Sequence, residues 1–180
     1  LIQHNADVDA RNDNQWSPLH YAADSGHKDM VELLIQHNAE VDTRDDNQRT
    51  PLHDAAYTGH KDVAELLIQH NAEVDARDDN QWSPLHYAAY TGHKDVVELL
   101  IQHNAEVDAR NDNQRTPLHS AADSGHKDMV ELLIQHNAEV DARDDNQWSP
   151  LHCAAYTGHK DVMELLIQHN AEVDARNDNQ

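Results

Sequence analysis

Sixteen histidines, 34 aspartates or glutamates and one cysteine are the side chains that could carry chemistry in this 180-residue chain. The histidines recur in three settings, after Leu, after Gly and after Gln. A zinc site needs ligands that converge on one point, often with thiolates, but Cys153 stands alone and no Cys-x-x-Cys or His-Glu-x-x-His motif occurs. We therefore predict no metal site and no cofactor, and at most adventitious binding of transition metals.

The carboxylates and the cysteine give no more support to catalysis. Cys153 directly follows His152, which is adjacency in sequence rather than the geometry of a nucleophile and its base. No glycine-rich loop is present to hold a phosphate, and the repeated acidic stretches such as AEVDARDD are typical of solvated loops. Carboxylates acquire catalytic pKa values in deep pockets that exclude water, which a thin repetitive chain does not offer. We therefore predict that the chain is not an enzyme.

The charge balance narrows the class of partner. Lys and Arg number 13 against 34 for Asp and Glu, and the formal net charge is −21. Nucleic acids and anionic membrane surfaces attract clustered cations, so both are disfavoured as partners, whereas a basic protein or peptide would be attracted. No apolar run is long enough to span a membrane, and a single cysteine suits a reducing compartment. We expect an intracellular location, in the cytoplasm or the nucleus.

An internal repeat organises the whole chain. All five prolines and all five glycines recur at intervals of 33 residues. They define five full units, at 12–44, 45–77, 78–110, 111–143 and 144–176. Residues 1–11 match the end of a unit and residues 177–180 match the start of one. We therefore interpret residues 1–180 as a single array of tandem repeats.

Each unit predicts two short helices. In 78–110, Ser83 is placed to cap a helix that starts at Pro84 and stops at Gly92. The segment KDVVELLIQH predicts a second helix, ending near Asn104, with an apolar face made of Val96, Val97, Leu99, Leu100 and Ile101. Two such helices cannot bury this face alone, but stacked neighbours can. The sequence therefore predicts an all-α solenoid.

The segment SPLHYAAYTGHKDVVELLIQHNAEVDA (83–109) resembles an ankyrin repeat, and equivalents of it recur five times in register. The resemblance implies stacked antiparallel helix pairs, with hairpin-like loops that project at roughly a right angle and border a concave groove. Two positions depart from the glycines common in the family. One holds Gln15, Gln48, Gln81, Gln114 and Gln147; the other holds Asn38, Asn71, Asn104, Asn137 and Asn170. Because Gln adopts positive φ poorly, we expect the preceding Asn to make the loop turn.

Three positions of the unit vary most and contain all the Trp and Tyr residues. The first variable position precedes Ser/Thr-Pro, the second follows Leu-His, and the third follows Ala-Ala. In the family these positions line the groove that commonly holds protein partners, and Trp, Tyr and Arg are enriched in binding hot spots. We therefore predict a non-catalytic protein-interaction scaffold, with these partner-binding residues: Trp16, Arg49, Trp82, Arg115 and Trp148; Tyr21, Asp54 and Tyr87; Asp24, Tyr57, Tyr90, Asp123 and Tyr156.

The variable positions are also compatible with drift and with a structural role. Single-base changes account for every difference between units, so exposed positions would also drift in a recently duplicated array without any partner. This scatter favours a natural array over an engineered consensus scaffold. A structural alternative is a spacer, or an array that self-associates end to end. Its last helix pair would expose an apolar face containing Val162, Leu165, Leu166 and Ile167.

Overall fold

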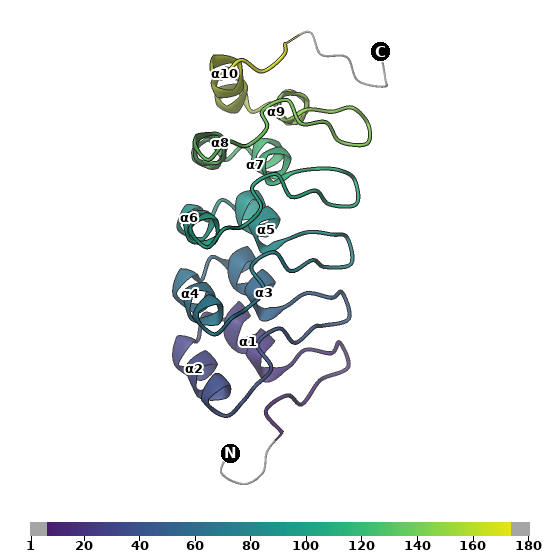
Figure 1. Ribbon diagram of the computed structural model, residues 1–180. Helices are drawn as coiled ribbons and strands as arrows, with labels where there is room; N and C mark the ends of the chain where they lie inside the picture. Colours follow the sequence, from purple (N-terminus) through teal and green to yellow (C-terminus); the bar gives the residue numbers. More distant parts are fainter. Residues whose placement is uncertain (1–6, 174–180) are drawn as a thin grey trace.

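The computed structural model describes residues 7–173 and shows ten helices and no strand among them. The helices are α1 (Pro18–Asp24), α2 (Lys28–Gln36), α3 (Pro51–Thr58), α4 (Lys61–Gln69), α5 (Pro84–Thr91), α6 (Lys94–Gln102), α7 (Pro117–Ser124), α8 (Lys127–Gln135), α9 (Pro150–Thr157) and α10 (Lys160–Gln168). Figure 1 shows the odd-numbered first helices in one column, the even-numbered second helices in a second column, and the loops on the opposite side. The predicted all-α solenoid is confirmed.

Recurring residue types set the start and the end of each first helix. At α5, the Oγ of Ser83 accepts a hydrogen bond from the backbone N–H of His86, at 3.4 Å. Pro84 lies in the first turn, where a backbone N–H would have no acceptor within the helix. Gly92 ends the helix in the left-handed conformation, with φ of 81°. Because a Cβ there would also overlap the His126 ring of the next unit, this position requires glycine for two reasons.

Aliphatic side chains of the second helices fill the layer between the two columns. In α6, residues at helical spacing are buried: Val96, Val97, Leu99 and Leu100. Full burial of each such side chain contributes roughly 1.5–3 kcal/mol. The helix ends at Gln102, and the chain leaves it through Asn104, whose φ is 65°. Stacked burial of this kind, unit upon unit, replaces the single thick core of a globular domain.

The last helix pair is better covered than the sequence predicted. Of the apolar face expected to be open, Val162, Leu165 and Leu166 are 0%, 6% and 0% exposed, and Ile167 alone is open, at 43%. The correction has a simple cause, because α10 packs against both α9 and α8. Most of that face therefore points into the array.

The turn in each loop is made by glutamine, contrary to the prediction that the preceding asparagine would make it. Gln81 has φ of 60°, and the equivalent glutamines have φ between 58° and 61°. An acceptor side chain organises the loop around it, since Asp78 Oδ1 accepts hydrogen bonds from the backbone N–H groups of Asn80 and Trp82, each at 2.8 Å. The backbone N–H of Gln81 also donates to the Asp78 carbonyl, at 3.0 Å. These bonds offset the strain of a left-handed glutamine.

Candidate protein-interaction surface

In the first four units, the histidine after Pro-Leu joins its unit to the next one. The backbone N–H of Ser83 donates to His86 Nδ1 at 3.2 Å, so the ring proton lies on Nε2. That Nε2–H donates to the carbonyl of Arg115 in the next unit, at 3.0 Å. Burial lowers the pKa of His86 to about 4, although the bond to the Arg115 carbonyl acts in the opposite direction. The ring is therefore a neutral structural bridge, as are the rings of His20, His53 and His119.

Further rows of contacts between units were not predicted from the sequence. His93 Nε2 lies 3.1 Å from the carbonyl of Tyr57 in the preceding unit. Arg77 Nη2 donates to the Glu106 carboxylate at 3.0 Å, and Asp75 Oδ1 accepts from the Glu106 backbone N–H at 3.0 Å. The loop arginines therefore tie neighbouring loops together. These contacts recur from unit to unit and fix the variable positions at equivalent places in each unit.

Four rings from two neighbouring units form a central aromatic cluster, which we define as Tyr57, Trp82, Tyr87 and Tyr90. Trp82 lies 5.1 Å from Tyr87 and 5.9 Å from Tyr90, measured between ring centroids. Tyr57 meets Tyr87 edge to face at 5.9 Å. Tyr57 and Tyr90 are each 44% exposed, whereas Trp82 and Tyr87 are half-buried. The cluster therefore offers two open rings supported by two covered ones.

Tyr87 connects the cluster to two neighbouring buried residues. Its hydroxyl donates to Asp78 Oδ2 at 2.6 Å, and its ring lies 5.8 Å from the buried His53 ring. Burial, together with the Asp78 carboxylate, raises the pKa of Tyr87 well above its ordinary value. The phenol is therefore protonated at neutral pH, and its position is fixed by the same Asp78 that organises the loop.

Arg49 extends the cluster toward the N-terminus. Its guanidinium carbon lies 5.0 Å from the centroid of Tyr87 and 5.8 Å from that of Tyr57, within cation–π range. Its Nη2 donates to Asp54 Oδ1 at 2.6 Å. The Arg49 side chain is 22% exposed, so its charge is held against the rings rather than extended into solvent.

Asp54 does not lie on the surface, and the prediction that it contacts a partner is wrong in this respect. The side chain is 0% exposed, and its Oδ2 has no hydrogen-bond partner among the described residues. Burial raises the pKa of Asp54 to about 8, while the Arg49 guanidinium acts in the opposite direction. The sequence alone could not show this burial, because the same position holds a 52%-exposed Tyr21 in the first unit.

Arg115 occupies the position of Arg49 two units later and makes different contacts. Its Nη2 lies 3.5 Å from Asp123 Oδ1 and 3.3 Å from the Cys153 sulfur. Ser120, at the second variable position, is buried. Burial raises the pKa of the Cys153 thiol to about 11, so the thiolate that a nucleophile requires is scarce at neutral pH.

The aromatic residues at the two ends lie outside the central cluster. Trp16 contacts Tyr21 at 5.0 Å, and its indole N–H donates to Asp45 in the next unit at 3.1 Å. Trp148 contacts Tyr156 at 5.3 Å, and Tyr156 is 78% exposed. The predicted aromatic residues therefore form three separate groups, the central cluster and one pair near each end, and the groups differ in exposure.

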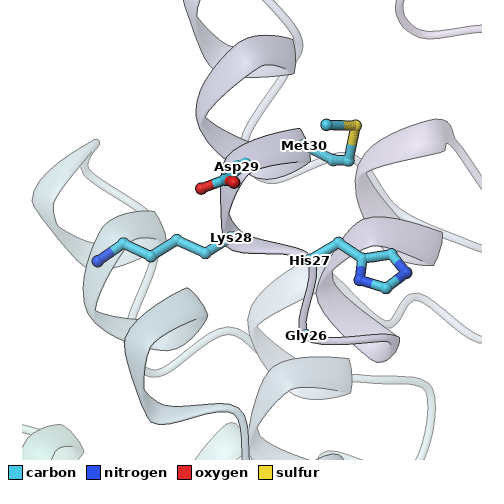
Figure 2. Close-up of a pocket in the computed structure, with 5 residues that line it drawn as sticks. All are labelled: Gly26, His27, Lys28, Asp29 and Met30. Atoms are coloured by element: carbon cyan, nitrogen blue, oxygen red, sulfur yellow. The ribbon is translucent and has the colours of Figure 1, made fainter.

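The remaining features of the described residues supply little chemistry. Residues 7–173 contain no group of three His, Cys, Asp or Glu side chains arranged to hold a metal ion. Figure 2 shows a hollow lined by Gly26, His27, Lys28, Asp29 and Met30, at the start of α2. Its side chains diverge, and all but the glycine are exposed, so they do not form an enclosed site.

Comparison with known families agrees with this architecture. A model of ankyrin repeats, built on three copies, matches residues 1–78, 37–111, 71–144 and 105–177. The chain therefore belongs to the ankyrin repeat family, whose repeats are general protein–protein interaction modules. None of the curated proteins compared with the chain matches it. Within residues 7–173, no helix combines the length and the apolar character needed to cross a bilayer.

Proposed function

We propose that the chain is a non-catalytic scaffold that binds a protein or peptide over the three variable positions. The observation that carries this proposal is the central aromatic cluster. Tyr57 and Tyr90 are each 44% exposed on the side where the units differ, while the histidine bridges beneath them are buried and repeated. Aromatic side chains at the centre of an interface commonly contribute ~2 kcal/mol or more each.

The contacts of the cluster favour recognition over drift. Trp82 lies against both Tyr87 and Tyr90, and Tyr57 reaches across to the next unit to meet Tyr87. Rings supported in this way lose little side-chain entropy when a partner covers them. A partner would therefore meet a surface that is already ordered.

Site-specific photo-crosslinking tests the proposal. A crosslinking residue at position 90 should capture a partner in cell extract, whereas the same residue at position 69, which is exposed at the end of α4 on the second-helix column, should not. The double substitution Tyr57→Ala/Tyr90→Ala should abolish affinity capture, and Gln69→Ala/Gln102→Ala should leave it unchanged. Equal capture by both double variants, each with an unaltered circular dichroism spectrum, would refute the proposal.

End-to-end self-association is a second candidate, and the glycine–histidine contacts favour it. At the internal junctions a histidine ring lies against the preceding unit's glycine, as His60 does against Gly26. No described atom lies within 4 Å of a Cβ built on Gly158, and His27 in Figure 2 is exposed, so a second copy could place His27 there.

The loop side of the N-terminal end opposes such stacking. Asp9 already accepts a hydrogen bond from the Glu40 backbone, and Arg11 donates to the Arg44 carbonyl. An added unit would have to displace both contacts. Light scattering decides the matter: a mass that stays monomeric across a wide concentration range excludes stacking, and a mass that rises must fall again in His27→Ala.

A further inference from the structure

Beside the central aromatic cluster, the charged side chain that lacks a bonding partner is acidic. Both arginines of the variable positions are already engaged, because Arg49 donates to the buried Asp54 side chain at 2.6 Å and Arg115 pairs with Asp123 at 3.5 Å. Asp24, in contrast, has no ion pair with any residue in the described range 7–173. The whole chain carries a formal charge of −21, so its field attracts cations toward this side as well.

The third variable positions of the first four full units form a row. The row reads Asp24, Tyr57, Tyr90 and Asp123, so two partly exposed phenol rings lie between two carboxylates. The hydroxyls of Tyr57 and Tyr90 make no hydrogen bond to the other described residues. A phenol ring carries negative potential on its face, and a neighbouring carboxylate adds to that potential.

Arg49 shows which group these rings accept. Its guanidinium lies over Tyr57 and Tyr87, at 5.8 Å and 5.0 Å from their centroids. No cation of the described residues lies over Tyr90, although its exposure equals that of Tyr57. The chain therefore fills one cation position itself and leaves an equivalent ring open.

We propose that the row Asp24–Tyr57–Tyr90–Asp123 binds an extended, arginine-containing segment of a partner protein. Guanidinium groups of the segment would stack on the open ring faces and pair with Asp24, the carboxylate of the row that has no ion pair among the described residues, whereas Asp123 already pairs with Arg115. Arginine is preferred to lysine because its planar group both stacks on a ring and bonds a carboxylate. This inference rests on the proposed function and gives the partner a chemistry.

Synthetic peptides test the preference directly. The probes are peptides of repeating Arg-Gly-Ser triplets, with Lys-Gly-Ser and Glu-Gly-Ser counterparts of equal length, blocked at both ends and labelled for fluorescence anisotropy. We expect the arginine peptide to bind, the lysine peptide to bind about 5-fold more weakly, and the glutamate peptide not to bind. Equal affinity for the arginine and lysine peptides would overturn the inference.

Matched variants separate the row from the general field of an acidic protein. Asp24→Asn should weaken binding of the arginine peptide by about 5-fold, because it removes a carboxylate that belongs to the row. Glu65→Gln removes the same charge from the exposed side of α4 and should change the affinity by less than about 2-fold. Tyr57→Ala/Tyr90→Ala should weaken binding by about 10-fold or more. Equal effects of Asp24→Asn and Glu65→Gln would show attraction by net charge alone and would overturn the inference.

The outcomes also distinguish this inference from the proposed function. If position 90 crosslinks to a partner but the arginine peptide does not bind, the basic chemistry is wrong and the interaction surface stands. If neither binds, both are wrong. Each variant is compared with the parent chain by thermal unfolding, so a loss of affinity is counted only where the fold is retained.

Discussion

Arg49 and Arg115 occupy the same position two units apart, yet their neighbours hold them differently. Around Arg49 the second and third variable positions are Asp54 and Tyr57, and the guanidinium donates to the buried Asp54 side chain while it covers aromatic rings. Around Arg115 the acidic residue occupies the third variable position instead of the second, as Asp123. The Arg115 guanidinium pairs with Asp123 and contacts the Cys153 sulfur, and it does not cover a ring.

The location of one carboxylate therefore decides what an otherwise identical arginine does. The two arginine side chains have similar exposure, 22% and 26%, but their partners differ, with Asp54 at 0% and Asp123 at 32%. The Arg49–Asp54 pair covers the N-terminal side of the aromatic cluster. The second pair stays partly in water, where ion pairs contribute little to stability.

The largest predicted effect concerns the frame that both arginine units share. The pKa of His53 and that of His119 are each lowered from 6.5 to about 4 by burial. A lowered folded-state pKa gives stability that is present above pH 6.5 and lost as the pH falls through about 4, amounting to about 3 kcal/mol for each ring. Urea unfolding between pH 7 and pH 4 should show this loss.

Substitutions check that this frame is common to the two units. His53→Gln and His119→Gln should each reduce the pH dependence by the same amount, and Gln69→Ala, which removes no titratable group from the exposed end of α4, should not change it. Unequal effects of the two substitutions would mean that the two units differ in how their buried histidines are held, and not only in where their acidic residue lies.

The next prediction separates the two pairs. Asp54→Ala leaves the Arg49 guanidinium without its buried acceptor and should lower the free energy of unfolding by about 3 kcal/mol. Asp123→Ala removes a partly solvated partner of Arg115 and should cost less than about 1 kcal/mol. Chemical denaturation at neutral pH measures both, and comparable losses would end the distinction drawn between the two arginines.

The smallest effect is a difference in pH dependence between the parent chain and Asp54→Asn, above pH 6.5. Asp54 has a raised folded-state pKa, of about 8, so its contribution is complete below its ordinary value of 3.8 and is lost as the pH rises through 8. The stability of the parent chain relative to Asp54→Asn, which cannot ionise, should therefore fall by about 1 kcal/mol per pH unit between pH 6.5 and pH 8, because the histidine contributions are the same in both proteins and cancel. The same comparison made with Asp123→Asn should show no such difference.

Local rules made much of the fold predictable. Ser83, Pro84 and Gly92 act as cap, first residue and stop of α5 because each controls backbone groups within a few residues of itself. The same holds for Asn104, which adopts the left-handed conformation expected of it. The glutamine turn was mispredicted because the stabilising bonds come from Asp78, and no propensity of glutamine records that support.

The site was predictable as a set of positions but not as a set of contacts. Repeat register showed where the rings and charges must recur, and the rings of Tyr57 and Tyr90 do lie open. Whether Asp54 is buried, and whether an arginine covers a ring, depend on residues of the adjoining unit such as Tyr87. Such contacts join residues about one repeat apart in the sequence, and local sequence patterns do not predict them.

The sequence by itself determined the 33-residue unit and the positions within it that vary. It also determined the two helices of each unit, because backbone caps and apolar periodicity act over short distances. Only the tertiary structure decided which of the variable residues face solvent and which face each other. Burial depends on the adjoining unit, and stacking placed one carboxylate in the interior and left another in water.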